Sequence, residues 1–548
     1  MILHICTPER CSGNLFVRRN AVPVILCTPE RCSGNYSPEQ RSGLHTMKIF
    51  SSTQIRAWDT VTIENEPIDS VNLMNRAAQV FTDWFIQTYP DNSRPIVIFC
   101  GTGNNGGDGV AVARLLHWLG FEAKVLVCDF AEKRSADFEA QIAALPKHGN
   151  ISLEWFNTAK DLPEVGPNAL VIDALFGSGL NRPLAGEWAQ VVDCLNQLPN
   201  EVVAIDLPSG LISDTHTAGE SVVQADRTFS FERPKLAFFF PENAERVGEW
   251  DFGSIGLQAD FEENTSTPYN YLTQMEAAAL YRPRPKFSHK GSFGHALLVA
   301  GSFGKMGAAV LASKACLRSG VGLLTIHAPR SGNIILQSAV PEDMVSADHR
   351  AKYWAEVPDL QGYASIGVGP GIGKEPETAL ALQGLLQAFK KPMVLDADAL
   401  NLLSENPSCW DFVPKNSILT PHPKEFERLF GKTENNFQRN DLQRKRAQEH
   451  QVFILLKGAN TAIACPDGSC WFNSTGNPGM ATGGTGDVLT GILTGLLAQG
   501  YPPKSASLLG VYLHGLAGDL AASNLSQEAL TAENIVEFLG QAWLELEG

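Results

Sequence analysis

The chain has 548 residues, of which 44% are hydrophobic, and it carries a formal net charge of −16 at pH 7. This length exceeds what one hydrophobic core supports and predicts two to four domains. The acidic balance argues against nucleic-acid and anionic-membrane partners, because both bind to a basic face of a protein. An anionic ligand must then be held by local features such as helix N-termini and individual lysines.

The first residues contain one nonapeptide, CTPERCSGN, twice, at 6–14 and at 27–35. No apolar periodicity surrounds the two copies, whereas structural repeats carry core positions. Their four cysteines have no histidine at ligand spacing, which argues against a zinc site. We predict that residues 1–46 are a non-native or disordered extension and that Met47 opens the protein.

The remaining seven cysteines are scattered without the spacing of a disulfide framework. No apolar run reaches the length of a transmembrane helix, and the N-terminus lacks the pattern of a signal peptide. We therefore expect a cytoplasmic protein with no membrane partner.

Residues 52–89 have helical apolar spacing, and residues 94–129 read as strand, glycine-rich turn, helix and strand, which is a parallel βαβ unit. Strand-like runs at 168–177 and 201–210 each end in an acidic residue and a glycine-rich turn. Ligands bind outside the carboxyl ends of strands in an open parallel sheet. One site is therefore expected to contain Asn104, Asn105, Asp108, Asp173, Asp206 and Ser209.

The loop GTGNNGGDG contains a G-x-G-x-x-G pattern, which is a weak dinucleotide signal when taken alone. Three motifs in order are more specific: NNGGDG (104–109), VIDALFGSGLNRP (171–183) and DLPSG (206–210). Together they resemble the YjeF N-terminal domain, the NAD(P)H-hydrate epimerase family. The resemblance implies a Rossmann-like α/β sandwich.

The resemblance also implies the binding residues. The nucleotide hydrate would be bound by Asn104, Asn105, Gly106, Gly107, Asp108, Gly177, Ser178, Gly179, Leu180, Asn181, Arg182, Pro183 and Asp206. A potassium ion would be held by Asn105, Asp173 and Ser209, whose oxygen atoms suit a hard cation. The centre to be inverted is C6 of the hydrated nicotinamide ring, where one bond must break and re-form. A proton shuttle is needed, and Asp206 and Asp108 are both candidates.

A polar, acidic stretch at 257–273 predicts a linker, with a boundary near Glu263 between an epimerase domain (47–262) and a second domain (263–548). The second domain repeats strand and functional loop in the segments 301–307, 365–373, 393–401, 417–429 and 452–463. This ordered set, followed by GGTGD, resembles the ribokinase-like fold. Within that fold it resembles the ADP- or ATP-dependent NAD(P)H-hydrate dehydratase family, the YjeF C-terminal domain.

The segment NPGMATGGTGDVLTGILTGLLAQG (477–500) is a turn and a glycine cluster followed by an apolar run with helical spacing. It predicts a helix N-terminus that binds a phosphoryl group through backbone N–H groups. Asp487 lies in the first turn of that helix. It is either a simple cap or the general base acting on a hydroxyl group, and the density of glycines favours the base.

Further roles follow from the family resemblance. Nucleotide binding is assigned to Lys457, Gly458, Ala459, Asn460, Thr461, Gly483, Gly484, Thr485 and Gly486. Hydrate binding in this domain is assigned to Ala308, Gly371, His422 and Asp487. Asp396 and Asp398 support Mg²⁺ or are helix caps. Lys424 stands where the family usually has glycine, so the shape of that loop is open.

The sequence thus predicts a bifunctional enzyme that equilibrates the epimers of NADH or NADPH hydrate (NADHX and NADPHX) and dehydrates one of them with ADP or ATP. Phosphorylation would turn the C6 hydroxyl into a good leaving group. One alternative is a small-molecule kinase fused to a binding module. Another makes the first domain a non-catalytic or RNA-associated scaffold. A homo-oligomer is expected, and the sequence does not distinguish ADP from ATP.

Overall fold

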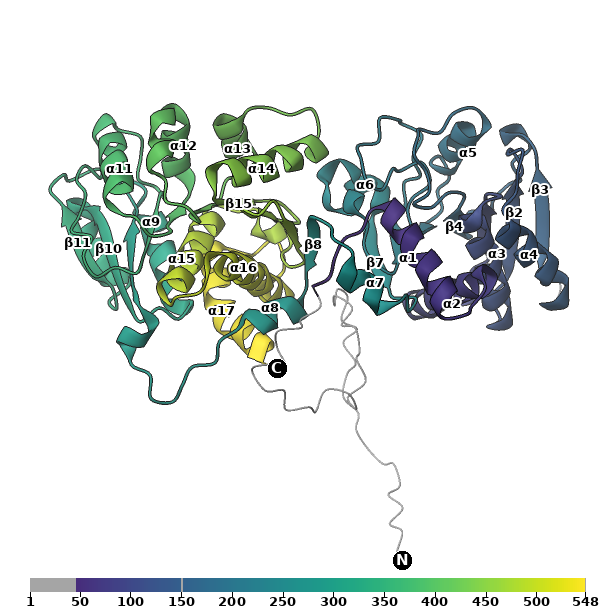
Figure 1. Ribbon diagram of the computed structural model, residues 1–548, viewed down its shortest axis with the longest axis horizontal. Helices are drawn as coiled ribbons and strands as arrows, with labels where there is room; N and C mark the ends of the chain where they lie inside the picture. The colour runs from purple at the N-terminus through teal and green to yellow at the C-terminus, as the bar shows by residue number, and fades with distance from the viewer. Residues whose placement is uncertain (1–45, 149–150, 548) are drawn as a thin grey trace, which may run out of the picture.

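The computed structural model describes residues 46–148 and 151–547, which form two α/β domains lying side by side (Figure 1). The first domain is built on a seven-stranded sheet and the second on a ten-stranded sheet. Both copies of CTPERCSGN lie outside the described residues. Within the described residues, no helix combines the length and apolar character needed to cross a membrane.

All strands of the first sheet run parallel, in the order β3-β2-β1-β4-β5-β6-β7. The strand order changes direction between β1 and β4, and such a switch point opens a crevice at the carboxyl ends of the strands. The predicted strands at 94–129, 168–177 and 201–210 are confirmed as β1, β2, β4 and β5. The strands are β1 (Ile96–Cys100), β2 (Ala123–Cys128), β3 (Ser152–Phe156), β4 (Leu170–Ala174), β5 (Val202–Ile205), β6 (Arg227–Phe231) and β7 (Glu249–Gly253).

Helices cover both faces of this sheet. Phe81 of α2 and Val110 of α3 pack on one face, and Val191 of α5 packs on the other. The helical stretch predicted at 52–89 is confirmed as two helices, α1 and α2. The helices are α1 (Ser52–Asn65), α2 (Ser70–Thr88), α3 (Asn104–Trp118), α4 (Ala136–Ala144), α5 (Glu187–Leu195), α6 (Ala244–Val247) and α7 (Ala259–Asn264).

The second sheet has the order β11-β10-β9-β12-β13-β14-β15-β16-β17-β8 and is mixed. The pairs β15–β16 and β16–β17 are antiparallel, and the remaining neighbours are parallel. The strands are β8 (Tyr269–Leu272), β9 (His295–Val299), β10 (Leu323–Pro329), β11 (Met344–Asp348), β12 (Ser365–Val368), β13 (Val394–Leu395), β14 (Ile418–Leu419), β15 (Phe453–Leu456), β16 (Ala462–Ala464) and β17 (Cys470–Asn473).

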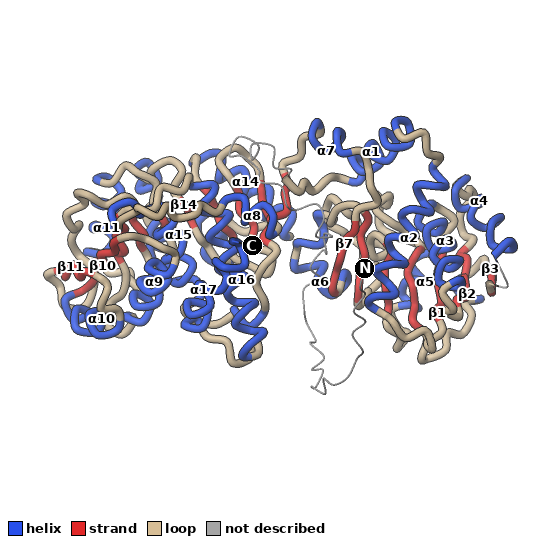
Figure 2. Tube along the Cα trace, turned by 90° about the horizontal axis from the view of Figure 1, so that it is seen from below, coloured by secondary structure: helices blue, strands red, loops and turns tan. Residues whose placement is uncertain are grey.

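This sheet also lies between two helical layers, as the red strands and blue helices of Figure 2 show. One layer contains α9 and α15–α17, and the other contains α11–α13. The helices are α8 (Gln274–Leu280), α9 (Met306–Arg318), α10 (Asn333–Ala339), α11 (Pro376–Ala388), α12 (Ala397–Glu405), α13 (Pro423–Phe430), α14 (Asn436–His450), α15 (Thr485–Ala498), α16 (Pro503–Leu525) and α17 (Ala532–Glu547).

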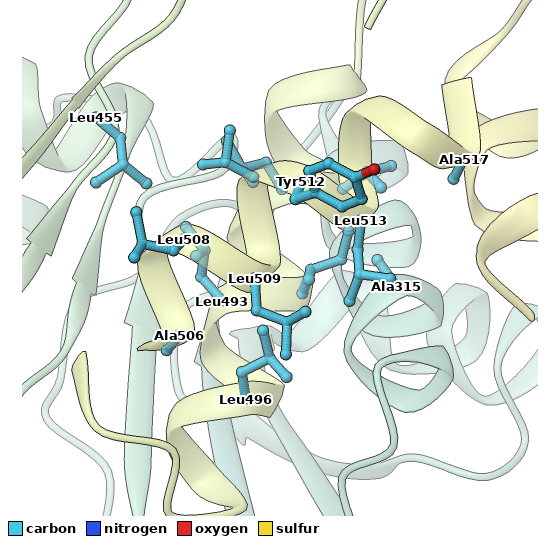
Figure 3. Close-up of a cluster of buried hydrophobic side chains, with 14 of the residues drawn as sticks. Ala315, Leu455, Leu493, Leu496, Ala506, Leu508, Leu509, Tyr512, Leu513 and Ala517 are labelled. Carbon is cyan, nitrogen blue, oxygen red and sulfur yellow. The ribbon is translucent and has the colours of Figure 1, made fainter. Parts of the chain in front are cut away.

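The helix predicted after GGTGD is confirmed as α15, which is the centre of the largest core cluster. Leu493 and Leu496 of α15 pack against Leu509 and Leu513 of α16 (Figure 3). A Cβ atom at Gly491 would lie 2.1 Å from the carbonyl oxygen of Ala312 in α9. The glycines of the apolar run therefore serve close helix packing, which fixes where α15 begins.

The two domains are joined by backbone pairing as well as by the chain connection. The segment before α1 pairs with β8 of the second sheet, since the Tyr271 N–H donates to the Met47 carbonyl at 2.8 Å and the Ile49 N–H to the Tyr269 carbonyl at 3.0 Å. Helix α7 spans the predicted boundary at 262/263. The stretch predicted as a linker therefore contains α7 and β8, and the division into 47–262 and 263–548 stays a prediction.

Candidate active sites

A cavity of about 790 Å³ lies at the carboxyl end of the first sheet. Of the predicted hydrate-binding residues, those that line it are Asn104, Asn105, Asp108, Gly177, Ser178, Gly179, Leu180, Asn181, Arg182 and Asp206. Gly106, Gly107 and Pro183 do not line it. A Cβ at Gly106 would lie 1.7 Å from the Gly101 carbonyl oxygen, so this glycine allows the turn after β1 to close on itself.

Of the predicted potassium ligands, Asp173 and Ser209 bond to each other, and Asn105 lines the cavity. Asp173 and Ser209 are both buried, and the Ser209 hydroxyl donates to the Asp173 carboxylate at 2.6 Å. The buried Asn105 side chain has an amide nitrogen without a hydrogen-bond partner among the described residues. No lysine or arginine in the described ranges forms an ion pair with Asp173. A buried carboxylate without a paired cation, beside a hydroxyl oxygen, fits a bound monovalent cation.

Asp206 faces the cavity and forms an ion pair that the sequence analysis missed. The Lys235 ammonium lies 2.9 Å from the Asp206 carboxylate, and the lysine side chain is only 1% exposed. Burial alone would raise the pKa of Asp206, but the charge of Lys235 outweighs it and leaves the pKa below its ordinary value. The backbone of Asp206 is also strained, with φ at +67°. Asp206 is thus held as a carboxylate in a fixed orientation.

Two other carboxyl groups line the same cavity, and their pKa values are raised rather than lowered. Burial, together with the charges of Asp206 and Asp59, raises the pKa of Asp108 well above its ordinary value. Asp59 on α1 was not predicted, and burial with repulsion from Asp206 raises its pKa to about 7. No local pattern marks Asp59, because its environment comes from loops far away in the sequence.

The second site lies at the start of α15. The backbone N–H groups of Thr485, Gly486 and Asp487 donate to no acceptor among the described residues, so they are open to a ligand. Gly484 has φ at +96°, which makes the tight turn into the helix. Burial and repulsion from Asp396 raise the pKa of Asp487 to about 7. A carboxylate with a pKa near neutral is suited to act as a general base.

Lys457 and Asp396 lie beside this helix start. The Lys457 ammonium is 2.9 Å from the Asp396 carboxylate, and a Cβ at Gly486 would lie 3.3 Å from the same nitrogen. Asp396 also accepts from the hydroxyls of Thr420 at 2.8 Å and Thr490 at 2.9 Å. Asp396 is the N-cap residue of α12, but its side chain makes no capping hydrogen bond. The residue instead joins β13, β14, β15 and α15 at one point.

Asp398 is likewise engaged, since its carboxylate accepts from the Gly373 N–H at 2.9 Å and lies 3.4 Å from the Lys305 ammonium. The predicted hydrate residues Ala308 and Gly371 do come together, because a Cβ at Gly371 would lie 3.2 Å from the Ala308 Cβ. The start of α9 and the loop after β12 therefore lie against each other.

His422 begins α13 and caps it. Its Nδ1 accepts from the N–H groups of Lys424 at 3.1 Å and Glu425 at 3.3 Å, while the Glu425 side chain accepts from the His422 N–H. Because Nδ1 is an acceptor, the neutral ring carries its proton on Nε2, and partial burial lowers the pKa of His422. Lys424 takes part only through its backbone, so its presence is compatible with this turn.

The rest of the predicted nucleotide loop, Gly458, Ala459, Asn460 and Thr461, follows Lys457 between β15 and β16. The Thr461 hydroxyl donates to the Gly458 carbonyl at 3.2 Å, and its own carbonyl accepts from the Asn473 N–H at 3.1 Å. The loop is therefore closed on itself and tied to β17, next to the start of α15.

Helix α16 holds the glycine loop at both ends, which the sequence analysis also missed. The His514 Nε2 lies 2.9 Å from the Thr485 carbonyl oxygen. Five residues further on, Asp519 accepts from the Gly476 N–H at 2.8 Å and from the Asn477 side chain at 2.9 Å. Burial lowers the pKa of His514 to about 4, so the ring is neutral and donates to this carbonyl.

Fold and sites together define a two-domain α/β enzyme with one site at the carboxyl edge of each sheet. Residues 70–237 match the family described as YjeF-related protein N-terminus, and residues 296–540 match the NAD(P)H-hydrate dehydratase family.

Relatives match across both domains. The bifunctional NAD(P)H-hydrate repair enzyme of Moorella thermoacetica is 35% identical over 91% of this chain and 97% of its own length. That of Escherichia coli is 31% identical over 90% of this chain and 95% of its own length. The chain belongs to the family of bifunctional NAD(P)H-hydrate repair enzymes, and the resemblances drawn from its motifs are confirmed.

Among solved structures, the ADP/ATP-dependent NAD(P)H-hydrate dehydratase of Bacillus subtilis, co-crystallised with ATP and Mg²⁺, is 34% identical. It covers 50% of this chain and 98% of its own, with a TM-score of 0.45.

Proposed function

We propose that the first domain interconverts the (R) and (S) epimers of NADHX and NADPHX and that the second dehydrates the S epimer at the expense of ADP or ATP. Family membership supports the two activities. The observation that carries the finer assignment is Asp487, a carboxyl group with a pKa of about 7 beside open backbone N–H groups and a lysine–aspartate pair.

In the first domain, we assign the binding of the hydrated nicotinamide to the cavity and the proton abstraction to Asp206 rather than Asp108. The charge of Lys235 keeps the pKa of Asp206 below its ordinary value, whereas burial and acidic neighbours raise the pKa of Asp108 well above its own. Only an ionised carboxylate can take the proton of the C6 hydroxyl. Asn105, Asp173 and Ser209 would hold potassium, whose charge would balance the buried carboxylate and fix the loops around it.

In the second domain, Asp487 takes the proton of the C6 hydroxyl as the hydroxyl oxygen attacks the terminal phosphorus of the nucleotide. The glycine loop 483–486 stabilises the phosphoryl oxygens through its N–H groups, and Lys457 neutralises nucleotide phosphate. The lone pair of the ring nitrogen then expels phosphate, and loss of a proton from C5 restores the dihydronicotinamide ring. Mg²⁺, held near the partly exposed Asp398 through its water shell, would supply charge neutralisation on the phosphates.

Recovery of dihydronicotinamide absorbance from an epimeric mixture of NADHX tests this assignment, with ADP or ATP, Mg²⁺ and K⁺ present. The wild type should recover all of the cofactor. Asp487→Asn should lower dehydration by about 10³-fold, because general-base catalysis typically contributes 10²–10⁴-fold, and should leave epimerisation intact. If the recovered fraction stops at the fraction of S epimer in the mixture, the first domain is not an epimerase. Near-normal dehydration by the variant would show that Asp487 is not the general base.

Two further expectations remain predictions. The scattered cysteines support a cytoplasmic location, and a homo-oligomer is expected for this enzyme class. Size-exclusion chromatography with light scattering would determine the mass of the assembly.

A further inference from the structure

Asp59 is a carboxyl group of the first cavity that the mechanism above does not use. It lies in α1 with its neighbour Arg56, and both line the cavity with Asp206. Its carboxylate has no hydrogen-bond or ion-pair partner within residues 46–148 and 151–547. An unpaired carboxyl group on the wall of a substrate cavity is free to exchange a proton with a bound ligand.

The cations near Asp59 have other partners, which explains why the Asp59 carboxyl group is unpaired. Lys235 is committed to Asp206 and also donates to the Ser230 hydroxyl at 2.8 Å. Glu232, on the loop after β6, accepts from the Ser254 hydroxyl and the Ile255 N–H at 2.8 Å.

On its own helix, the Arg56 guanidinium donates to the Gly179 carbonyl at 3.0 Å. On α3, Asp108 is the other acidic neighbour. Asp206 and Glu232 therefore repel the charged form of Asp59, and Lys235, the cation that favours this form, is paired with Asp206.

Two carboxyl groups of one cavity thus have pKa values shifted in opposite directions. Lys235 holds the pKa of Asp206 below its ordinary value, whereas burial and repulsion raise the pKa of Asp59 to about 7. Such a separation between neighbouring carboxyl groups identifies the base and the acid of a site. The hydrate ring requires both, because its C6 carries a hydroxyl group and is bonded to the ring nitrogen.

We propose that Asp59 is a second catalytic acid–base residue of the epimerase, acting on the ring nitrogen while Asp206 acts on the hydroxyl group. Asp206 removes the hydroxyl proton, and the C6–O bond becomes a carbonyl group. The bond between C6 and the ring nitrogen breaks, its electron pair stays on nitrogen, and protonated Asp59 gives its proton to that nitrogen.

Rotation about the C5–C6 bond exposes the other face of the carbonyl group. Closure of the ring by the reverse proton transfers forms the other epimer and restores both carboxyl groups. No oxidant, reductant or co-substrate is consumed. The assignment rests on the proposed epimerase function of the first domain. It identifies the group that protonates the ring nitrogen, which the proposed function did not specify.

Asp59→Asn in the full chain tests the proposal, because asparagine keeps the shape of the side chain but cannot release a proton. Epimerisation should fall by about 10²–10⁴-fold, the usual contribution of a general acid or base. Dehydration of pure S epimer by the same chain should be unchanged, which controls for folding. Glu64→Gln, an exposed position on the same helix, is the matched variant and should epimerise at the wild-type rate.

The pH profile separates a catalytic role from a structural one. Wild-type epimerisation should decline as the pH rises through about 7, where Asp59 loses its proton. The residual activity of Asp59→Asn should lack this decline, and Asp59→Glu should restore both activity and decline.

Epimerisation within threefold of the wild type in Asp59→Asn, or an unchanged alkaline decline, would overturn the role of Asp59 while leaving the epimerase function in place. A wild-type chain that does not epimerise at all would overturn the proposed function itself.

Discussion

The two domains have unrelated sheets but place the same electrostatic arrangement at their carboxyl edges. In each, a lysine lies 2.9 Å from an aspartate, and a second carboxyl group nearby has a pKa of about 7. In the first domain the paired Asp206 faces the cavity, whereas in the second the paired Asp396 is 1% exposed and bonded to two threonines. The paired aspartate can therefore act on a substrate in the first domain, and only the unpaired Asp487 can do so in the second.

The largest effect should come from removing the lysines. Lys235→Met leaves Asp206 buried without a cation, and loss of one partner of a buried ion pair costs about 3–5 kcal/mol in the free energy of unfolding. Lys457→Met should cost less, about 1–2 kcal/mol, because the Lys457 side chain is 24% exposed and Asp396 keeps its threonine bonds. Urea unfolding followed by domain-specific hydrogen exchange measures both losses. Equal losses of unfolding free energy in the two variants would show that the different burial of the two lysines does not affect stability.

The loops of the two sites also differ in how they are held. Arg56 of α1 donates to the Gly179 carbonyl in the first domain, and it is exposed. His514 of α16 donates to the Thr485 carbonyl in the second domain, and its ring is half-buried, with a pKa that burial lowers to about 4.

An unfolded chain protonates this histidine near pH 6.5, so the stabilisation by His514 is complete above pH 6.5 and is lost as the pH falls towards 4. The full loss is about 3 kcal/mol.

His514→Gln should therefore flatten the decline of stability between about pH 6.5 and 4, measured by urea unfolding at each pH. The exposed His289 gives the matched control, and His289→Gln should keep the wild-type decline. An unaltered decline in His514→Gln would mean that other titrating groups dominate the acid sensitivity of this domain.

The two activities should respond to pH in opposite directions when one preparation is assayed for both. Dehydration needs ionised Asp487 and should fall about tenfold per pH unit below about 7, while epimerisation needs protonated Asp59 and should fall above about 7. Initial rates between about pH 5 and 9 in a constant-ionic-strength buffer give both profiles. Two declines of the same sign would contradict one of the two assignments.

Most of each site could be predicted because its residues follow buried strands in the sequence. Asn105, Asp173 and Ser209 come after β1, at the end of β4 and after β5, and parallel strands bring such positions to one edge. Asp59 and His514 could not be predicted in this way, because each lies within a helix whose pattern explains only its packing. Their roles depend on which loop lies opposite, and that is set by tertiary packing.

The role of Lys235 also depends on tertiary packing and could not be predicted from its position in the sequence. Lys235 follows β6, a strand that the sequence analysis did not identify, and its ammonium is surrounded by carbonyl oxygens of Phe231 and Arg233 as well as by Asp206. A single lysine after a short strand reads as an exposed residue. Only the closure of the loop around it makes it the cation of the first site.

The smallest predicted effect concerns the contact between the domains. Glu242 of the first domain accepts from the backbone N–H of Asn436 at 3.0 Å and from its side chain at 2.6 Å, at the beginning of α14 in the second domain. Nearby, Phe240 and Phe437 pack with ring centroids 4.3 Å apart. Because a helix N-terminus favours an acidic partner, Glu242→Gln should cost about 1 kcal/mol.

The loss should appear as a lower midpoint for the second domain although the substitution is in the first, and the exposed Glu245→Gln serves as its control. Calorimetry of the wild type should then give one cooperative transition that broadens in Glu242→Gln. Two separate transitions in the wild type would show that the interface does not couple the domains. The two lysine–aspartate pairs would then belong to two domains that unfold independently.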